Sequence, residues 1–155
     1  MIIAIDPGMS GGIVLGNELT GKIFKSIPMP STETDIANIF QNAQRNLTAG
    51  IIENVHSFPK QGVASSFKFG QGYGFLRGCL ISRKIPFLEV APQRWMGHFG
   101  MKRKDNETKT QYKNRLRGLA QQYFPVEDVT LKTADALLLF KYYLYEHYYH
   151  PRLKS

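Results

Sequence analysis

Apolar runs broken by turn residues organise the first part of the chain. Residues 2–5 form a continuous apolar run, which is typical of a strand buried on both faces of a sheet. Turn residues stop this run at Asp6 and leave its carboxylate at the mouth of the strand. Residues 10–15 and 22–27 predict two further strands joined by a short glycine-containing link. Together the three segments predict an antiparallel meander.

Helical and strand patterns alternate through the rest of the chain. Capping residues at 30–33 precede a helical pattern that extends to Leu47, and residues 50–53 predict a short strand that again ends in a carboxylate. The remaining predicted elements are a helix over 65–84, a strand over 86–90, and helices over 107–123 and 133–149. This order, βββαβαβαα, predicts an α/β fold: a mixed five-stranded sheet, made of the meander plus two strands and flanked by helices, in one domain over 1–155.

Two segments have unusual compositions. Residues 97–105 are basic and contain two glycines, which predicts a mobile loop. Gly70, Gly74 and Gly78 recur at every fourth position of one predicted helix and so share one of its faces. Because each glycine costs a helix ~1 kcal/mol relative to alanine, three in line indicate a close backbone approach, either by the sheet or by a second subunit.

Composition excludes several classes of protein. The 155 residues are 43% hydrophobic and 21% charged, which is ordinary for a globular domain. No apolar run approaches the ~20 residues that a membrane-spanning helix needs. Met1 leads directly into the first strand without a basic leader, so we expect a cytoplasmic protein. The lone Cys79 cannot form an internal disulfide, and a cysteine-rich zinc site is ruled out.

The positive charge is concentrated in the middle of the chain. The net charge is +8, and its excess lies between Lys60 and Arg117, whereas the N-terminal third is slightly acidic. Such asymmetry is typical of a surface that binds a polyanion, although a solvated surface that confers solubility gives the same pattern. The candidate DNA-binding residues are Lys60, Lys68, Lys102, Arg103, Lys104, Lys109 and Lys132.

Three acidic residues occupy positions where burial is expected. Asp6 ends the first strand, Glu53 ends the fourth, and Asp135 lies near the start of the last helix among apolar residues. If the first and fourth strands are neighbours, Asp6 and Glu53 project toward one place, and a helix above them could add Asp135. Three carboxylates without nearby His or Cys suit Mg²⁺ or Mn²⁺, and two such ions could hydrolyse a phosphodiester. Taken singly, the same acids could be a turn residue, a surface acid at a strand end and a helix N-terminal acid.

Motifs around these acids resemble a known family. The segments 5–8 (IDPG), 52–55 (IENV) and 134–137 (ADAL) resemble, in this order, the RuvC-like Holliday junction resolvases of the ribonuclease H-like superfamily. Residues 66–71 (SFKFGQ) are similar to the helix that follows the family's glutamate, and residues 90–95 (VAPQRW) look like the bacteriophage branch.

The resemblance implies a fold, an activity and a set of site residues. It implies a ribonuclease H-like fold and a homodimeric endonuclease that nicks opposed strands of a four-way DNA junction in a bacterium or an infected bacterial cell. Asp6, Glu53 and Asp135 match the metal-binding acids of the family, which would hold Mg²⁺, with Mn²⁺ as a substitute, as two ions per active site. The helix with the three aligned glycines matches the helix through which subunits pair.

The match leaves open which residues complete the site. The family has a catalytic lysine upstream of its last acid, which Lys113 matches best and for which Lys109 competes. Where relatives have an acid or histidine one turn before that last acid, this chain has Lys132. Three alternatives follow: three acids suffice together with the substrate phosphate, Asp128 substitutes if the helix extends two turns back, or Lys132 contacts phosphate beside a metal site with fewer ligands.

Two other functions compete with the endonuclease. Lys132 motivates a branched-DNA-binding protein with weak or absent cleavage. The first strand of actin-like phosphotransferases also ends in an Asp-x-Gly turn, as at Asp6, but that architecture needs a second lobe and another phosphate loop. The 155 residues contain no such loop, which argues against this class.

Overall fold

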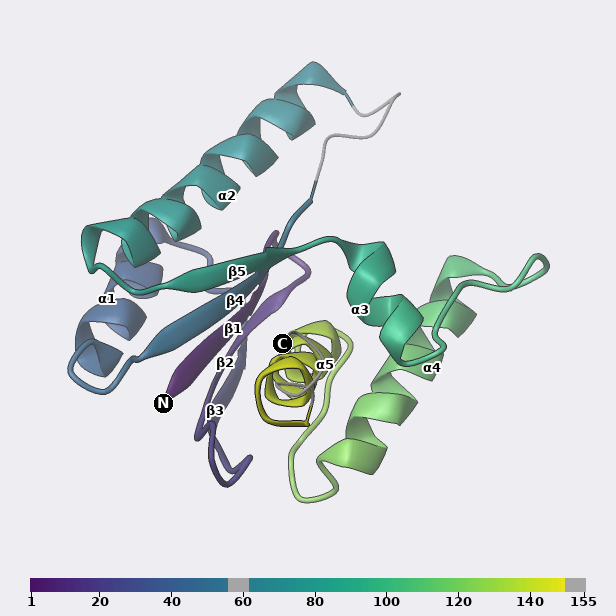
Figure 1. Ribbon diagram of the computed structural model, residues 1–155. Helices are drawn as coiled ribbons and strands as arrows, with labels where there is room; N and C mark the ends of the chain where they lie inside the picture. Colours follow the sequence, from purple (N-terminus) through teal and green to yellow (C-terminus); the bar gives the residue numbers. More distant parts are fainter. Residues whose placement is uncertain (56–61, 150–155) are drawn as a thin grey trace, which may run out of the picture.

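A computed structural model describes residues 1–55 and 62–149. Five strands form one sheet in the order β3-β2-β1-β4-β5, so the first strand lies at the centre (Figure 1). The strands are β1 (Ile2–Asp6), β2 (Gly12–Gly16), β3 (Ile23–Pro28), β4 (Ala49–Glu53) and β5 (Phe87–Val90). The predicted mixed five-stranded sheet is confirmed.

The register of the sheet brings two strand ends together. β1 pairs antiparallel with β2, which pairs antiparallel with β3, as the predicted meander requires. β1 and β4 are parallel neighbours, with Ile5 opposite Ile52. The next residues along the two strands are Asp6 and Glu53, so both carboxylates leave the sheet at the same edge.

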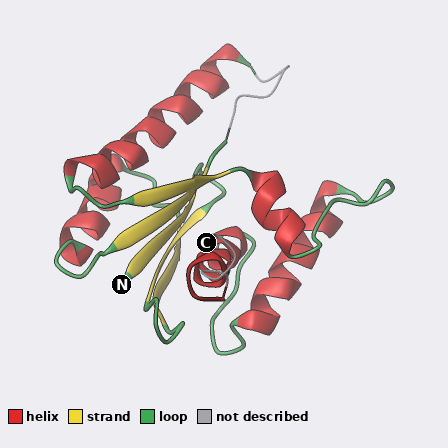
Figure 2. Ribbon diagram, viewed as in Figure 1, coloured by secondary structure: helices red, strands yellow, loops and turns green. Residues whose placement is uncertain are grey.

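Helices cover both faces of the sheet (Figures 1 and 2). α1 (Glu33–Ala43) and α2 (Val63–Ser82) lie on one face, and α5 (Ala134–Leu144) lies against the other. α4 (Lys109–Tyr123) packs on the outside of α5, and α3 (Pro92–His98) also contacts α5. A short π-helix, η1 (Tyr145–Tyr149), continues α5.

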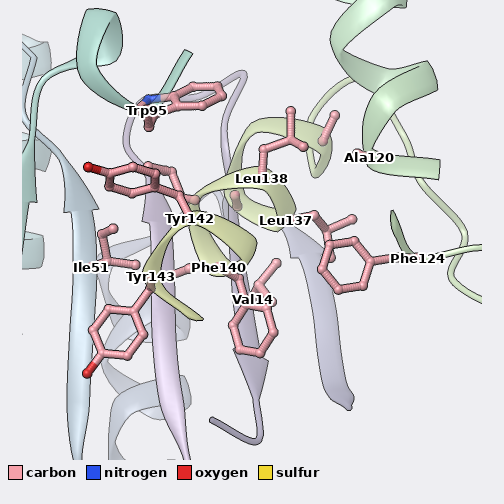
Figure 3. Packing of buried hydrophobic residues seen from close by; sticks show 14 of the residues in the cluster. Val14, Ile51, Trp95, Ala120, Phe124, Leu137, Leu138, Phe140, Tyr142 and Tyr143 are labelled. Carbon is pink, nitrogen blue, oxygen red and sulfur yellow. The ribbon is translucent and has the colours of Figure 1, made fainter. Parts of the chain in front are cut away.

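Alternation along β1 divides the core into two layers. Ile3 and Ile5 pack with α1 and α2, whereas Ile2 and Ala4 belong to the cluster that contains α5. All four side chains have no exposed surface, as predicted for a strand covered on both faces. Figure 3 shows part of that second cluster, with Leu137 and Leu138 of α5. In α5, every residue except Lys141 is buried, because the helix lies between the sheet and α4.

Three details of the predicted elements are wrong. No helix is predicted between the strand over 86–90 and the loop over 97–105, but this segment forms α3, whose first helical residue is Pro92. α4 begins at Lys109 and not at 107, because Thr108 and Gln111 form a capping box at its N-terminus. The last α-helix ends at Leu144 and continues as a π-helix.

The glycine face of α2 has no neighbour within the described chain. A Cβ atom built on Gly70, Gly74 or Gly78 would meet nothing within 4 Å. Of the two alternatives for the glycine face, packing against the sheet is therefore wrong, because α2 turns Leu76, Cys79 and Leu80 toward the core instead. Among residues 1–55 and 62–149, no helix has the length and apolar character needed to cross a membrane.

Gly12 lies where two backbone segments meet. A Cβ atom there would lie 2.7 Å from the carbonyl oxygens of Ile27 and Lys132, so even a methyl group would force backbone to move. Glycine at this position lets the turn before α5 rest directly on the first residue of β2.

We expect Gly12→Ala to lower the free energy of unfolding by ~1–3 kcal/mol, as overpacking against backbone generally does. Gly118→Ala is the matched control, because Gly118 lies in α4 with open space around it and alanine should stabilise that helix by ~0.5–1 kcal/mol. Chemical denaturation of both variants measures the difference. Equal stability of the two variants would contradict the close contact at Gly12.

Candidate active site

Three buried carboxylates gather at one edge of the sheet. Asp6 ends β1, Glu53 ends β4, and Asp135 is the second residue of α5. Their exposed fractions are 8%, 7% and 3%, and they are, with Thr133, the buried polar or charged residues among those described. Acidic side chains are rarely this buried without a partner or a metal.

The turn before α5 brings Asp135 toward the strand ends. Thr130 and Thr133 hydrogen-bond to each other through backbone and hydroxyl groups, including a 3.0 Å bond from the Thr130 N–H to the Thr133 hydroxyl oxygen. The Lys132 carbonyl lies against Gly12, which pairs with Asp6 in the sheet. α5 therefore begins directly beside the strand that carries Asp6.

Lys113 supplies a positive charge to this cluster. Its ammonium group forms an ion pair and hydrogen bond with Oδ2 of Asp135, although the two residues lie 22 positions apart. Lys109 lies one helical turn earlier and is exposed. Of the two lysines that sequence left in competition, the structure brings Lys113 to the acids.

Burial and the charges of neighbouring groups raise the pKa values of Asp6 and Glu53. Burial raises the pKa of Asp6 well above its usual value, the negative charges of Asp135 and Glu53 raise it further, and Lys113 opposes them. Burial likewise raises the pKa of Glu53 to about 7. Burial alone would lower the pKa of Lys113, but the neighbouring acids, Asp135 first, raise it above its usual value.

Trp95 adds a hydrogen bond to the cluster. Its indole Nε1–H donates to Oε1 of Glu53 at 2.8 Å, and both side chains are buried. Sequence reasoning missed this contact, because it crosses from α3 to the end of β4 and no spacing links the two residues. Pro92 at the start of a helical turn was the available signal for α3.

The donor set fits a hard divalent cation. The oxygens come from three carboxylates, and Oδ1 of Asp135 is buried without a hydrogen-bond partner. A cation there would satisfy this oxygen and relieve the repulsion that raises the pKa values of Asp6 and Glu53. Within residues 1–55 and 62–149, however, no three His, Cys, Asp or Glu side chains are arranged as a ready-made metal site.

The predicted DNA-binding residues have different surroundings. Exposed side chains at the candidate positions are Lys68 on α2, Lys102, Arg103 and Lys104 before α4, Lys109 at its first residue, and Lys132 in the turn before α5. Lys60 lies outside the described residues. Lys109 is four residues before Lys113, so the exposed lysine lies one turn from the ion pair along the same face of α4.

The basic loop before α4 is tied down by one glutamate. The Glu107 carboxylate accepts hydrogen bonds from Nε and Nη2 of Arg115, both at 2.8 Å. It also accepts one from the Lys104 backbone N–H at 3.1 Å. The Arg103 guanidinium donates to the Glu107 carbonyl oxygen at 2.8 and 3.0 Å. The Arg115 hydrogen bond lowers the pKa of Glu107 to about 2. Within the predicted loop over 97–105, residues 97–98 belong to α3 and the rest form no helix or strand. The hydrogen bonds of Arg103 and Lys104 link this loop to Glu107, and its mobility stays a prediction.

Asp128 does not lie on the last helix. It is exposed in the connection between α4 and α5, and α5 begins only at Ala134. The possibility that the last helix extends back to Asp128, two turns before Asp135, is therefore wrong. Lys132 is exposed beside the start of α5 and is not a member of the buried cluster.

A separate cavity of about 400 Å³ lies between α1 and α2. Its lining includes Gly8, Met29, Lys68 and Phe69, and is mostly apolar. Asp6, Glu53, Asp135 and Lys113 do not line it. The candidate site is therefore not this cavity but the acidic cluster at the carboxyl ends of β1 and β4, beside α5.

Comparison with known proteins identifies the fold. No protein-family model matches the chain, and no curated protein matches it. The structure is similar to Thermus thermophilus RuvC, with a TM-score of 0.58 at 16% identity over 94% of each chain. It is also similar to T. thermophilus RuvC in complex with a Holliday junction substrate, with a TM-score of 0.62 at 16% identity over 94% of this chain and 93% of the other. The chain has the RuvC fold.

The RuvC likeness extends over nearly the whole described chain. In both comparisons the similar region covers 94% of this chain. The ribonuclease H-like fold expected from the sequence motifs is therefore confirmed.

Removing one charge from the cluster should stabilise the protein when no metal is present. In the unfolded chain Glu53 loses its proton near the ordinary value of 4.5, and in the folded chain its pKa is about 7. The folded state binds more protons between these values, so stability falls as pH rises through this window. In chelator at pH 8 we expect Glu53→Gln to raise the free energy of unfolding by ~1–3 kcal/mol, and at pH 5 we expect little change.

Thermal and denaturant unfolding at pH 5 and pH 8 measure this effect. Asp105→Asn is the control, because Asp105 is an exposed loop acid. A Glu53→Gln variant that is destabilised equally at both pH values would contradict the claim that the buried negative charge of Glu53 lowers stability at high pH.

Proposed function

We propose that the protein is a divalent-cation-dependent DNA endonuclease that resolves four-way junctions. The observation that carries the proposal is the cluster of Asp6, Glu53 and Asp135 with Lys113 beside it. Burying carboxylates whose charges repel one another lowers the stability of the folded protein. A phosphodiesterase that uses Mg²⁺ or Mn²⁺ needs such carboxylates to bind its cations.

Each residue of the cluster has a role in this proposal. Asp6, Glu53 and Asp135 would hold the cations, and the unpartnered Oδ1 of Asp135 is the oxygen best prepared to do so. Bound Mg²⁺, as two ions in this proposal, would activate a water and stabilise the leaving oxygen. Lys113 holds Asp135 in place through its ion pair and adds positive charge where a phosphate would approach.

The exposed basic residues would hold the DNA. Lys102 and Lys104 lie in the loop that Glu107 and Arg115 fix in place, and Lys109 continues the positive surface toward Lys113. Charged groups on a fixed loop lose less entropy when they bind phosphate. The fold shared with RuvC, including RuvC bound to a Holliday junction substrate, supports a branched substrate.

The proposed active form is a homodimer that pairs through α2. The open face of this helix carries the three aligned glycines together with exposed apolar side chains at a similar spacing: Val63 at 88%, Phe67 at 69% and Ile81 at 57% exposure. Exposed apolar side chains in a row are typical of an interaction surface. Two subunits would place two sites on one junction and allow paired nicks.

The proposed setting is the cytoplasm of a bacterium or of an infected bacterial cell. This part of the proposal rests on the sequence motifs, and the segment 90–95 in particular supports the bacteriophage branch.

We expect Asp6→Asn to abolish cleavage of a synthetic four-way junction while leaving binding of the junction intact. The asparagine keeps the size of the side chain but loses the charge that the cation needs, so the rate of cleavage should fall by at least ~100-fold. Gel assays with end-labelled junctions in Mg²⁺ and in Mn²⁺ measure cleavage, and binding is measured in Ca²⁺ or chelator.

The same assay separates the competing function. A branched-DNA-binding protein without cleavage would give tight, salt-sensitive binding but no product in either metal. Undiminished cleavage by Asp6→Asn would contradict the assigned site. Glu33→Gln is a suitable control, because Glu33 is an exposed acid in the first turn of α1.

The subunit arrangement gives a separate prediction. Gly74→Arg places a charged side chain in the middle of the open face of α2, so it should convert a dimer into a monomer. Gly118→Arg, on the exposed side of α4, should leave the dimer intact. Analytical ultracentrifugation distinguishes the two. A wild-type protein that stays monomeric at tens of micromolar would contradict pairing through α2.

A further inference from the structure

Trp95 is the single tryptophan of the chain, and its polar atom is directed at a proposed metal ligand. The indole Nε1–H donates to Oε1 of Glu53 at 2.8 Å. Trp95 has no exposed surface and Glu53 has 7%. The bond joins residues 42 positions apart, so it exists only because α3 packs beside the end of β4.

The choice of acceptor is the informative feature of this contact. A buried indole N–H needs a hydrogen-bond acceptor, and a backbone carbonyl would satisfy it without adding a charge. Here the acceptor is a carboxylate close to two other carboxylates, which is a costly group to keep buried. The uncharged N–H of Trp95 compensates part of the free energy lost by burying Glu53, and it does not neutralise the negative charge that a cation would need.

The packing around Trp95 fixes the direction of the N–H. The ring lies in the cluster formed by α3, α4, α5 and the sheet, and Figure 3 shows it above Tyr142 of α5. A ring held on all sides cannot rotate its donor away. A glutamate side chain can adopt many rotamers, so a fixed donor on one oxygen selects the orientation of the whole carboxylate.

We propose that Trp95 is a positioning residue, whose indole N–H holds Oε1 of Glu53 and orients this carboxylate for divalent-cation binding with Asp6 and Asp135. The inference rests on the proposed function, because it assumes that these acids bind the cation. Trp95 touches neither the cation nor the DNA in this proposal and acts only through Glu53. It thereby extends the site to α3.

A single tryptophan makes the contact directly observable. The ¹⁵N-labelled protein should give one indole N–H cross-peak by nuclear magnetic resonance. In the full-length chain without DNA, we expect this peak to shift upfield in Glu53→Gln, because an amide oxygen is a weaker acceptor than a carboxylate. We also expect Mg²⁺ alone to shift it in the wild type. Asp6→Asn is the comparison variant and should shift the peak less than Glu53→Gln.

Trp95→Phe removes the N–H and keeps an aromatic ring. We expect the affinity for Mg²⁺, measured by calorimetry without DNA, to fall by ~10–100-fold, as when other groups that orient metal ligands are removed. Leu138→Val is the matched control, because Leu138 lies in the same cluster. It should loosen the core to a similar extent without changing the affinity for Mg²⁺.

The outcomes separate this inference from the proposed function. An indole peak that does not respond to Glu53→Gln would overturn the positioning role, even if Trp95→Phe failed to fold. Wild-type Mg²⁺ affinity in a folded Trp95→Phe variant, or no Mg²⁺ binding by the wild type, would also overturn it. If the peak and the affinity respond as expected but the wild type cuts no junction, the positioning role stands and the proposed nuclease function falls.

Discussion

Three buried carboxylates and one half-buried ammonium group form a single cluster, and the packing of the strands and helices that carry them holds the cluster together. Asp6 and Glu53 leave the sheet side by side because β1 and β4 are parallel and in register. Asp135 joins them at the start of α5, and Lys113 neutralises part of the charge. Such a cluster tends to disperse or to take up protons, which the raised pKa values of Asp6 and Glu53 reflect. The acids lie on β1, β4 and α5, whose neighbouring residues are buried in the apolar core.

α5 connects the core to this cluster. Its burial on all sides gives it a fixed place between the sheet and α4, so the position of Asp135 follows from hydrophobic packing. α4 packs on α5 and carries Lys113, and the loop that precedes α4 is tied to it by Glu107 and Arg115. The acids and the basic surface are therefore connected through the packing of α4 on α5, which suits a protein proposed to hold DNA and to cut it at a fixed place.

Much of this architecture could be predicted from sequence, because it follows from local patterns. The apolar run of β1 and the strand that ends at Glu53 predicted the sheet, and the acids at the strand ends marked the candidate site. Contacts between distant segments could not be predicted in this way. Whether Lys109 or Lys113 reaches Asp135 depends on the rotation of α4 against α5. The bond from Trp95 depends on α3, a short helix that the sequence pattern did not predict. The open glycine face of α2 became evident only when the fold placed nothing against it.

The central claim is that the buried acids bind a divalent cation, and Mn²⁺ makes this directly visible. Crystals of the full-length protein grown or soaked with Mn²⁺ should give an anomalous difference peak among the carboxylates of Asp6, Glu53 and Asp135. Oδ1 of Asp135 should be within coordinating distance of that peak. A protein with Mn²⁺ bound only elsewhere, or with no anomalous peak at millimolar Mn²⁺, would contradict the account.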